Sequence, residues 1–297
     1  MTSIAVLGPG GVGGFVAAAL SRAGADVTVV ARDPTASVLA RDGFRVQSVR
    51  LGTFTARPAV VTVLRAPTDA LLVATKSAGL AAGLGRIETD PGLVVPLLNG
   101  LEHMALLRER FGNRVAAGVI RVESDRPAPG EIVQTSPALR IDIADDAPAR
   151  RAAVHALAAT LEAAEIPVRL DPSEADLLWS KLLRLNALAC TTSAYDLALG
   201  EIRADPVRQA ALEACVLEAA AVAAAEGAHL DPAATLGELR DAHPGQGSSM
   251  RRDLAAGREP ELDAIPGAVI RAGARHGLAC PVVSELTERI RVRMCAG

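Results

Sequence analysis

One lysine stands out among the charged residues of this 297-residue chain. Lysine and arginine together number 31, yet lysine occurs only at Lys76 and Lys181. Lys181 lies in ADLLWSKLLRLNALA, residues 175–189, a segment that is otherwise mostly apolar. An ammonium group changes its pKa on burial and can give up a proton, whereas a guanidinium stays charged. Lys181 is therefore suited to protonate a carbonyl oxygen while hydride reaches the carbonyl carbon.

Lys181 also has a structural interpretation. On a helix it shares a face with residues three and four positions away, namely Leu177, Leu178, Arg184 and Leu185. A lysine in such a mainly apolar stripe can extend its amine to solvent. The rarity of lysine in this chain favours the chemical role.

A second polar cluster lies in SSMRRDLAAGREPELD, residues 248–263. Ser248 and Ser249 stand at a predicted helix start, where they either cap the helix or bind a carboxylate. Glu261 begins the next predicted helix. Its carboxylate either stabilises the helix dipole or orients Lys181 and contacts cofactor or substrate.

A glycine-rich loop, LGPGGVGG at residues 7–14, contains the pattern GxGxxG as Gly8, Gly10 and Gly13. In dinucleotide-binding folds the first glycine permits a tight turn and the second lets a diphosphate approach the backbone. The third allows the helix to pack on the strand. An ordinary turn is the alternative, but the predicted strand and helix on either side favour dinucleotide binding.

The end of the second predicted strand bears on the choice of dinucleotide. An acidic residue there binds the ribose 2′-OH of NAD, whereas an arginine accepts the 2′-phosphate of NADP. In VVARD, Arg32 directly precedes Asp33. Because Asp33-Pro34 is typical of a helix start, we predict NADP (NADPH) with Arg32 as its phosphate ligand. A solvated strand end is the other interpretation of Arg32.

Two further polar residues follow predicted strands. Lys76 comes after ALLVAT, and Asn99-Gly100 comes after LVVPLL. Ligands bind at the carboxyl ends of parallel strands. Asn-Gly is also common in simple turns, but we expect Lys76 and Asn99 to contact cofactor or substrate.

The elements that must position these residues alternate in the first half of the chain. Predicted helices cover residues 11–23, 34–42, 77–85, 101–111 and 147–163. Predicted strands, several apolar throughout, cover residues 3–8, 26–32, 44–48, 59–64, 70–75, 93–98, 115–120 and 166–170, with two more within 126–143. This repetition predicts an α/β fold with a Rossmann-type doubly wound parallel sheet.

Strand signals disappear in the second half. Helices are predicted there at residues 173–194, 205–227, 232–242, 248–256, 261–276 and 281–294. We therefore predict a Rossmann domain over residues 1–170 and an all-α domain over residues 171–297. The Ala-rich helices of the second domain are suited to pack a homodimer.

The bulk composition excludes several classes of protein. Half of the residues are hydrophobic and 22% are charged, as in soluble globular proteins. The net charge of −3 leaves no basic excess, so we expect no nucleic-acid partner. The four cysteines lack zinc-ligand spacing and are expected to be buried, and no metal site is predicted. Without a signal-peptide pattern or a membrane-helix pattern, we expect a cytoplasmic protein with no membrane partner.

Taken together, these residues resemble the ketopantoate reductase (2-dehydropantoate 2-reductase) family over nearly the whole chain. The single residues that carry the resemblance are Arg32, Lys76 and Asn99. The ordered motifs are GPGGVG at 8–13, LLNG at 97–100, LLWSKL at 177–182, LGEI at 199–202, SSMRRD at 248–253, PELD at 260–263 and ARHGLACP at 274–281.

The resemblance implies an NADPH-dependent reduction of a 2-oxo acid, ketopantoate to pantoate in pantothenate biosynthesis. The site would lie in a cleft between a Rossmann domain and a helical domain similar to the C-terminal domain of 6-phosphogluconate dehydrogenase. Lys181 would be the proton donor and a substrate ligand, and Ser249 would bind the substrate carboxylate. Lys76, Asn99 and Glu261 would contact cofactor or substrate. The remaining cofactor ligands would be Gly8, Pro9, Gly10, Gly11, Val12, Gly13 and Arg32.

The chain departs from the family pattern at two positions after Lys181. The family has asparagines four and eight residues after the catalytic lysine, where this chain has Leu185 and Ala189. Asn186 is five residues on, about 140° round the helix, so we expect it to face away. Loss of these hydrogen bonds should lower the selectivity for ketopantoate.

Three hypotheses remain open from the sequence. The first is a ketopantoate reductase. The second is a reductase of a more apolar 2-oxo acid on the same fold, which Leu185 and Ala189 would suit. The third is a non-catalytic NADP-binding sensor, which would have no need of Lys181, Ser249 and Glu261.

Overall fold

The computed structural model describes residues 2–296, which form two compact units. The first unit contains the residues up to Leu98 and those from His103 to Glu174. The second contains Asn99–Glu102 and the residues from Ala175 onward. The domain boundary predicted at residues 170/171 stays a prediction.

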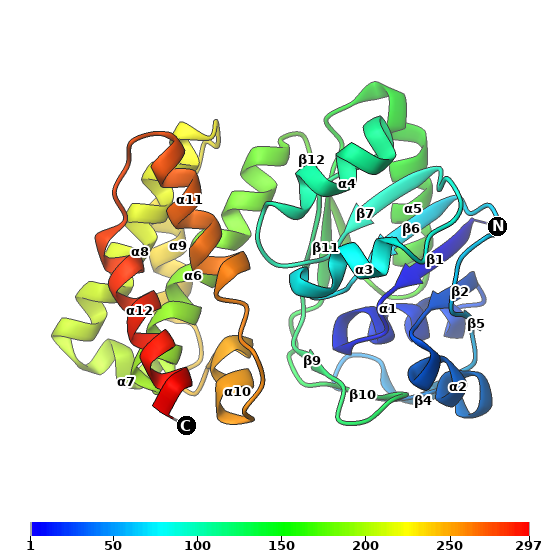
Figure 1. Ribbon diagram of the computed structural model, residues 1–297, viewed down its shortest axis with the longest axis horizontal. Helices are drawn as coiled ribbons and strands as arrows, with labels where there is room; N and C mark the ends of the chain where they lie inside the picture. Colours follow the sequence, from blue (N-terminus) through cyan, green and yellow to red (C-terminus); the bar gives the residue numbers. More distant parts are fainter. Residues whose placement is uncertain (1, 297) are drawn as a thin grey trace. The chain divides into compact units, whose positions relative to one another are not determined.

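A five-stranded parallel sheet forms the centre of the first unit (Figure 1). In spatial order its strands are β5 (Ala59–Val61), β2 (Asp26–Val30), β1 (Ser3–Leu7), β6 (Ala70–Val73) and β7 (Leu93–Pro96). Every residue of β6 and β7 is buried, which explains their uniformly apolar sequences. The chain adds strands outward from β1 on one side and from β6 on the other. Ligands bind at such a switch point in doubly wound sheets.

The helices of the first unit follow these strands. They are α1 (Gly11–Arg22), α2 (Asp33–Asp42), α3 (Leu80–Leu84), α4 (His103–Phe111) and α5 (Arg151–Ala163), with 3-10 turns at Ser77–Gly79, Gly112–Arg114 and Pro148–Arg150. Helix α1 packs against β2 and also against strands of a second sheet. Its residues from Phe15 to Leu20 are therefore wholly buried. A helix buried on all sides explains the Ala-rich sequence here.

Not every predicted strand joins the parallel sheet. The strand predicted at 44–48 is β3 (Phe44–Ser48), but it belongs to a four-stranded sheet ordered β4-β3-β10-β9. A three-stranded sheet is ordered β12-β11-β8. The remaining strands are β4 (Gly52–Ala56), β8 (Gly118–Arg121), β9 (Ser124–Asp125), β10 (Glu131–Gln134), β11 (Arg140–Ala144) and β12 (Val168–Asp171). β3 alternates buried and exposed residues, so its pattern differs from that of the central strands.

The second unit is helical, as the sequence predicts. Its helices are α6 (Glu174–Tyr195), α7 (Leu199–Ala204), α8 (Pro206–Ala225), α9 (Pro232–Asp241), α10 (Ser249–Ala255), α11 (Ala268–Arg275) and α12 (Pro281–Ala296). The helix predicted at 261–276 is divided, because a π-helical turn containing Pro266 covers Asp263–Gly267 before α11 begins. Such turns are frequent at functional sites.

The cysteines of the chain differ in their exposure. Cys190, Cys215 and Cys280 are buried, but Cys295 is exposed, so the expectation of four buried cysteines is wrong at this position. Cys295 lies on α12 near the end of the chain, where little packs over it.

Among residues 2–296, no helix combines the length and the apolar character that a membrane crossing needs.

Candidate active site

The glycine loop joins β1 to α1 in a conformation that requires glycine. Gly8 has φ +91°, and a Cβ there would lie 2.8 Å from Thr75 Cγ2. A Cβ on Gly13 would lie 2.3 Å from the carbonyl oxygen of Gly8. By contrast, nothing lies within 4 Å of the position of a Cβ on Gly10. The loop therefore packs tightly against β6 and α1 but stays open at its second glycine.

This open side suits a diphosphate. Gly10 is the N-cap of α1, so no side chain caps the helix, and its first turn contains no acidic residue. The N–H groups of the first turn and the helix dipole favour an anion there. Of the other loop residues, Pro9 is buried, whereas Gly11 and Val12 are half-buried.

Thr75, which the sequence reading missed, adds a polar group beside this loop. It follows β6, and its Oγ1 is buried without a hydrogen-bond partner among residues 2–296. A buried hydroxyl in this state is unfavourable unless another molecule satisfies it. A buried Thr75 hydroxyl beside the glycine loop, which is open at Gly10, fits a bound dinucleotide.

Arg32 and Asp33 are both exposed after β2. Arg32 is the N-cap of α2 and Asp33 is the first residue of that helix. Among the described residues, no hydrogen bond or ion pair involves the Arg32 guanidinium, so it is available to a phosphate. Lys76 is also exposed and precedes the 3-10 turn Ser77–Gly79 after β6. Both residues thus follow strands of the parallel sheet at their carboxyl ends.

Lys181 is half-buried on α6, within the helical unit. Leu185, one turn further along, is also half-buried, and Ala189 is completely buried. Asn186 is buried too, and its Oδ1 accepts a hydrogen bond from Cys190 Sγ at 3.5 Å. The positions one and two turns after Lys181 are therefore apolar in the folded chain.

Asn99 and Glu261 lie together in the second unit. Asn99 Nδ2 donates a hydrogen bond to Glu261 Oε2 at 2.8 Å. The next residue, Gly100, has φ +85°, and a Cβ there would lie 2.3 Å from the carbonyl oxygen of Ala264. Asn-Gly at this point is thus more than a turn, because it lets the backbone approach the π-helical segment closely.

Two residues that no sequence motif indicated, Arg271 and Glu102, form an ion pair in the same unit. Arg271 on α11 forms ion pairs with Glu102 and Asp263. The hydrogen-bonded Glu102 carboxylate, with that of Asp263, raises the pKa of Arg271 above its usual range. No motif pointed to these residues, because the contacts join segments far apart in the sequence.

The two adjacent serines have different roles in the structure. Ser248 is buried, accepts a hydrogen bond from the Arg251 N–H at 3.1 Å and contacts Thr192 Oγ1 at 2.8 Å. It therefore caps α10 and anchors this helix to α6. Ser249, the first residue of α10, is exposed and is the serine that can meet a ligand. Thr192, the α6 residue that Ser248 contacts, lies about three turns, or about 16 Å, along this helix from Lys181.

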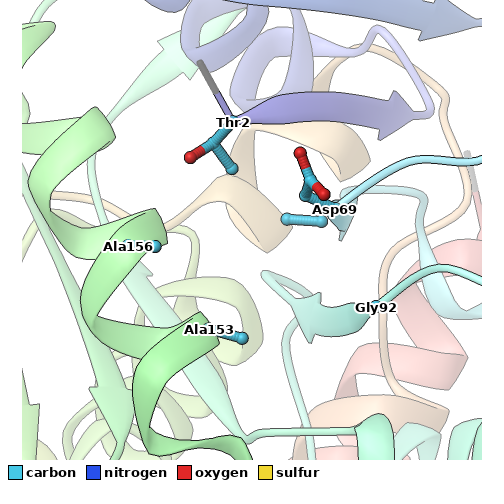
Figure 2. A pocket seen from close by; sticks show the side chains of 6 residues that line it. Thr2, Asp69, Gly92, Ala153 and Ala156 are labelled. Carbon is cyan, nitrogen blue, oxygen red and sulfur yellow. The ribbon is translucent and has the colours of Figure 1, made fainter.

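A cavity of about 490 Å³ in the first unit lies at the amino ends of the parallel strands, opposite to the glycine loop. Figure 2 shows Thr2, Asp69 and Gly92 around it, together with Ala153 and Ala156 of α5. The first three residues each precede a strand, so the cavity faces the amino ends of the strands. The Asp69 carboxylate accepts hydrogen bonds from Ser3 N and Oγ. Since ligands of such sheets bind at the carboxyl ends, this cavity is not the candidate site.

Comparisons with known proteins cover both units. Residues 4–146 match the family model described as Ketopantoate reductase PanE/ApbA, and residues 175–294 match Ketopantoate reductase PanE/ApbA C terminal. A 2-dehydropantoate 2-reductase of Caulobacter vibrioides is 32% identical over 295 residues, which is 95% of each chain.

Solved structures agree with this match. The crystal structure of 2-dehydropantoate 2-reductase from Geobacter metallireducens has a TM-score of 0.89 at 26% identity, over 97% of this chain and 99% of that one. D-mandelate dehydrogenase, solved with NADH and anilino(oxo)acetate, also has a TM-score of 0.89, over 99% of both chains. At 20% identity this second likeness shows the fold alone. The chain belongs to the ketopantoate reductase family of NAD(P)-dependent oxidoreductases.

Proposed function

We propose that this protein reduces a 2-oxo acid to a 2-hydroxy acid with NADPH, and that 2-dehydropantoate is the substrate to test first. The observation that carries the proposal is the 2.8 Å hydrogen bond between Asn99 and Glu261. The two residues belong to separate sequence motifs, and they form one polar group in the fold. The 32% identity to a 2-dehydropantoate 2-reductase supports the choice of substrate.

In this proposal each unit contributes its own residues. The glycine loop and the N-terminus of α1 bind the diphosphate, Arg32 binds the 2′-phosphate, and the Thr75 hydroxyl donates a hydrogen bond to the cofactor. When bound, the cofactor supplies the hydride to the carbonyl carbon. Ser249 holds the substrate carboxylate, and Lys76, Asn99 and Glu261 contact cofactor or substrate.

Lys181 is the proton donor in this proposal. As hydride reaches the carbonyl carbon, the C–O double bond becomes a single bond and its oxygen takes a proton from Lys181 Nζ. The amine regains its proton from solvent before the next turnover. An ammonium in a half-buried position can both polarise the oxygen and protonate it.

A more apolar 2-oxo acid is the second candidate substrate, because Leu185 is half-buried one turn from Lys181 and Ala189 is buried beyond it. A substrate hydroxyl next to Leu185 would have no hydrogen-bond partner on that side chain, which disfavours a hydroxylated acid.

The test is a set of steady-state assays with NADPH and NADH. The substrates are 2-dehydropantoate, branched aliphatic 2-oxo acids and an aryl 2-oxo acid. The highest kcat/KM for 2-dehydropantoate supports the first substrate, and a higher value for a branched or aryl acid supports the second. Binding of NADPH without turnover of any 2-oxo acid would overturn the proposal in favour of a sensor.

The Leu185→Asn variant separates the two substrates further. Adding a hydrogen-bonding group one turn from Lys181 should raise kcat/KM for 2-dehydropantoate relative to a branched acid by about tenfold. Leu185→Met, which keeps the site apolar, is the control and should leave the ratio near that of the wild type.

A further inference from the structure

We infer that Arg271 is a positioning residue that holds Asn99 against Glu261. The inference rests on the proposed function in one respect, namely that Asn99 and Glu261 serve the reaction. Among residues 2–296, no hydrogen bond or ion pair joins Arg271 to either residue, and Arg271 acts through the segment that carries Asn99.

The segment Asn99–Glu102 must be held in place by contacts of its side chains and backbone. It belongs to the second unit, whereas the chain on both sides of it, up to Leu98 and from His103, belongs to the first. Four residues thus carry Asn99 into the helical unit without a helix or strand of their own. Contacts that fix the ends of this short segment therefore help to keep Asn99 within hydrogen-bond distance of Glu261.

Arg271 fixes the far end of the segment through Glu102. Its Nε donates to Glu102 Oε1 at 2.8 Å, and its Nη2 donates to Oε2 at 2.6 Å. This is the bidentate geometry in which arginine restrains a carboxylate most strongly. A lysine at this position could keep the charge but not the two parallel hydrogen bonds.

The same guanidinium also holds the segment that carries Glu261. Its Nη1 donates to Asp263 Oδ1 at 2.7 Å, and its Nη2 donates to the Asp263 carbonyl oxygen at 2.8 Å. Asp263 begins the π-helical turn, two residues after Glu261. Arg271 therefore joins a residue just after Asn99 in the sequence to a residue just after Glu261.

The exposure of these groups argues against a large contribution to stability. The side chains of Arg271, Glu102 and Asp263 are 41%, 47% and 88% exposed. Ion pairs at such exposure contribute little to the free energy of unfolding. Their fixed geometry can still set where Asn99 lies.

A test that needs no turnover uses the small number of asparagines. The chain has three, Asn99, Asn113 and Asn186, so selective ¹⁵N-asparagine labelling gives three side-chain amide nitrogen signals. The Asn99→Ala variant assigns the signal of Asn99. We expect Arg271→Ala to shift or broaden the Asn99 signal and to leave the other two unchanged.

Arg275→Ala is the matched control. Arg275 lies on the same helix and pairs with Glu226 at 3.1 Å, so its loss removes a comparable ion pair away from Asn99. The Asn99 signal should stay in place in this variant. An unchanged Asn99 signal in Arg271→Ala would overturn the inference whatever the activity of the protein.

The kinetic test uses the Asn99→Ala background. In the wild-type background, Arg271→Ala should lower kcat/KM for the best 2-oxo acid about tenfold, and Arg271→Lys should recover only part of this loss. If Arg271 acts through Asn99, adding Arg271→Ala to Asn99→Ala should cause no further loss. Losses that multiply in the double variant would contradict the inference.

The two proposals fail in different ways. If the wild-type protein turns over no 2-oxo acid, the proposed function is wrong, while the shift of the Asn99 signal still tests the role of Arg271. If the wild-type protein turns over a 2-oxo acid and the Asn99 signal is unchanged in Arg271→Ala, the positioning role is wrong and the proposed function stands.

Discussion

Asn99 and Glu261 are 162 positions apart in the sequence, yet Asn99 Nδ2 lies 2.8 Å from Glu261 Oε2. The asparagine follows the last strand of the parallel sheet, and the glutamate precedes the π-helical turn of the second unit. This hydrogen bond joins the two polar residues of the candidate site in the helical unit.

The first prediction concerns this hydrogen bond. Asn99→Ala removes a donor to a charged acceptor and should lower kcat/KM about 10- to 100-fold, because such bonds contribute about 1.5–3 kcal/mol. Asn99→Asp should lower kcat/KM further, since it places a second carboxylate where the donor was. Steady-state kinetics of both variants provide the measurement. An Asn99→Asp enzyme as active as the wild type would show that this contact does not serve the reaction.

The second prediction concerns Lys181. Lys181→Ala should lower kcat by about 10²- to 10⁴-fold, the usual contribution of a general acid, and leave the Kd for NADPH nearly unchanged. Lys181→Arg should not restore turnover, because a guanidinium does not release its proton at neutral pH. The measurements are kcat and NADPH binding by calorimetry. Unchanged turnover in Lys181→Ala would remove the residue from the mechanism.

The third prediction concerns the choice of cofactor. Arg32→Ala should raise the Kd for NADPH about 10- to 100-fold, because the 2′-phosphate loses a charged hydrogen-bond donor. The Kd for NADH should change much less. Arg65→Ala, which removes an exposed arginine paired with Glu88 in the same unit, is the control and should affect neither. Equal losses for the two cofactors would argue against a phosphate-binding role for Arg32.

The fourth prediction concerns the Thr75 hydroxyl beside the glycine loop. Thr75→Val removes a buried hydroxyl that has no hydrogen-bond partner among residues 2–296, so it should raise the free energy of unfolding by about 1 kcal/mol while weakening NADPH binding. Thr192→Val is the control, since Thr192 Oγ1 bonds the Leu188 carbonyl oxygen and meets Ser248 Oγ. That variant should be destabilised instead. Chemical unfolding and NADPH titration measure both effects, and a destabilised Thr75→Val would contradict the first.

The fifth prediction concerns pH and Asp196 at the end of α6. Arg251, which hydrogen-bonds Asp196, and Arg293 hold the pKa of this carboxyl below its usual range. A lowered folded-state pKa contributes stability above the unfolded-state pKa, and this is lost as pH falls through the folded-state value. Asp196→Asn should therefore lower Tm at neutral pH, and the difference from wild type should shrink below about pH 4. A difference that stays constant between neutral and acid pH would contradict this linkage.

The sequence by itself determined the local features of the protein. The apolar runs of β6 and β7, the glycine loop and the single lysine of α6 depend on short-range patterns, because each reports the geometry or burial of its own segment. The helical character of the second unit follows for the same reason. The resemblance to the family could also be stated from ordered motifs alone.

The tertiary structure decided what the local patterns could not. The alternating strand at Phe44–Ser48 pairs with β10 rather than joining the parallel sheet, since pairing depends on partners distant in the chain. Likewise, Gly100 approaches Ala264, Arg271 bonds Glu102, and Ser248 is a structural cap while Ser249 stays exposed. Short-range spacing carries no information about such contacts, because they form only when segments far apart in the sequence pack together.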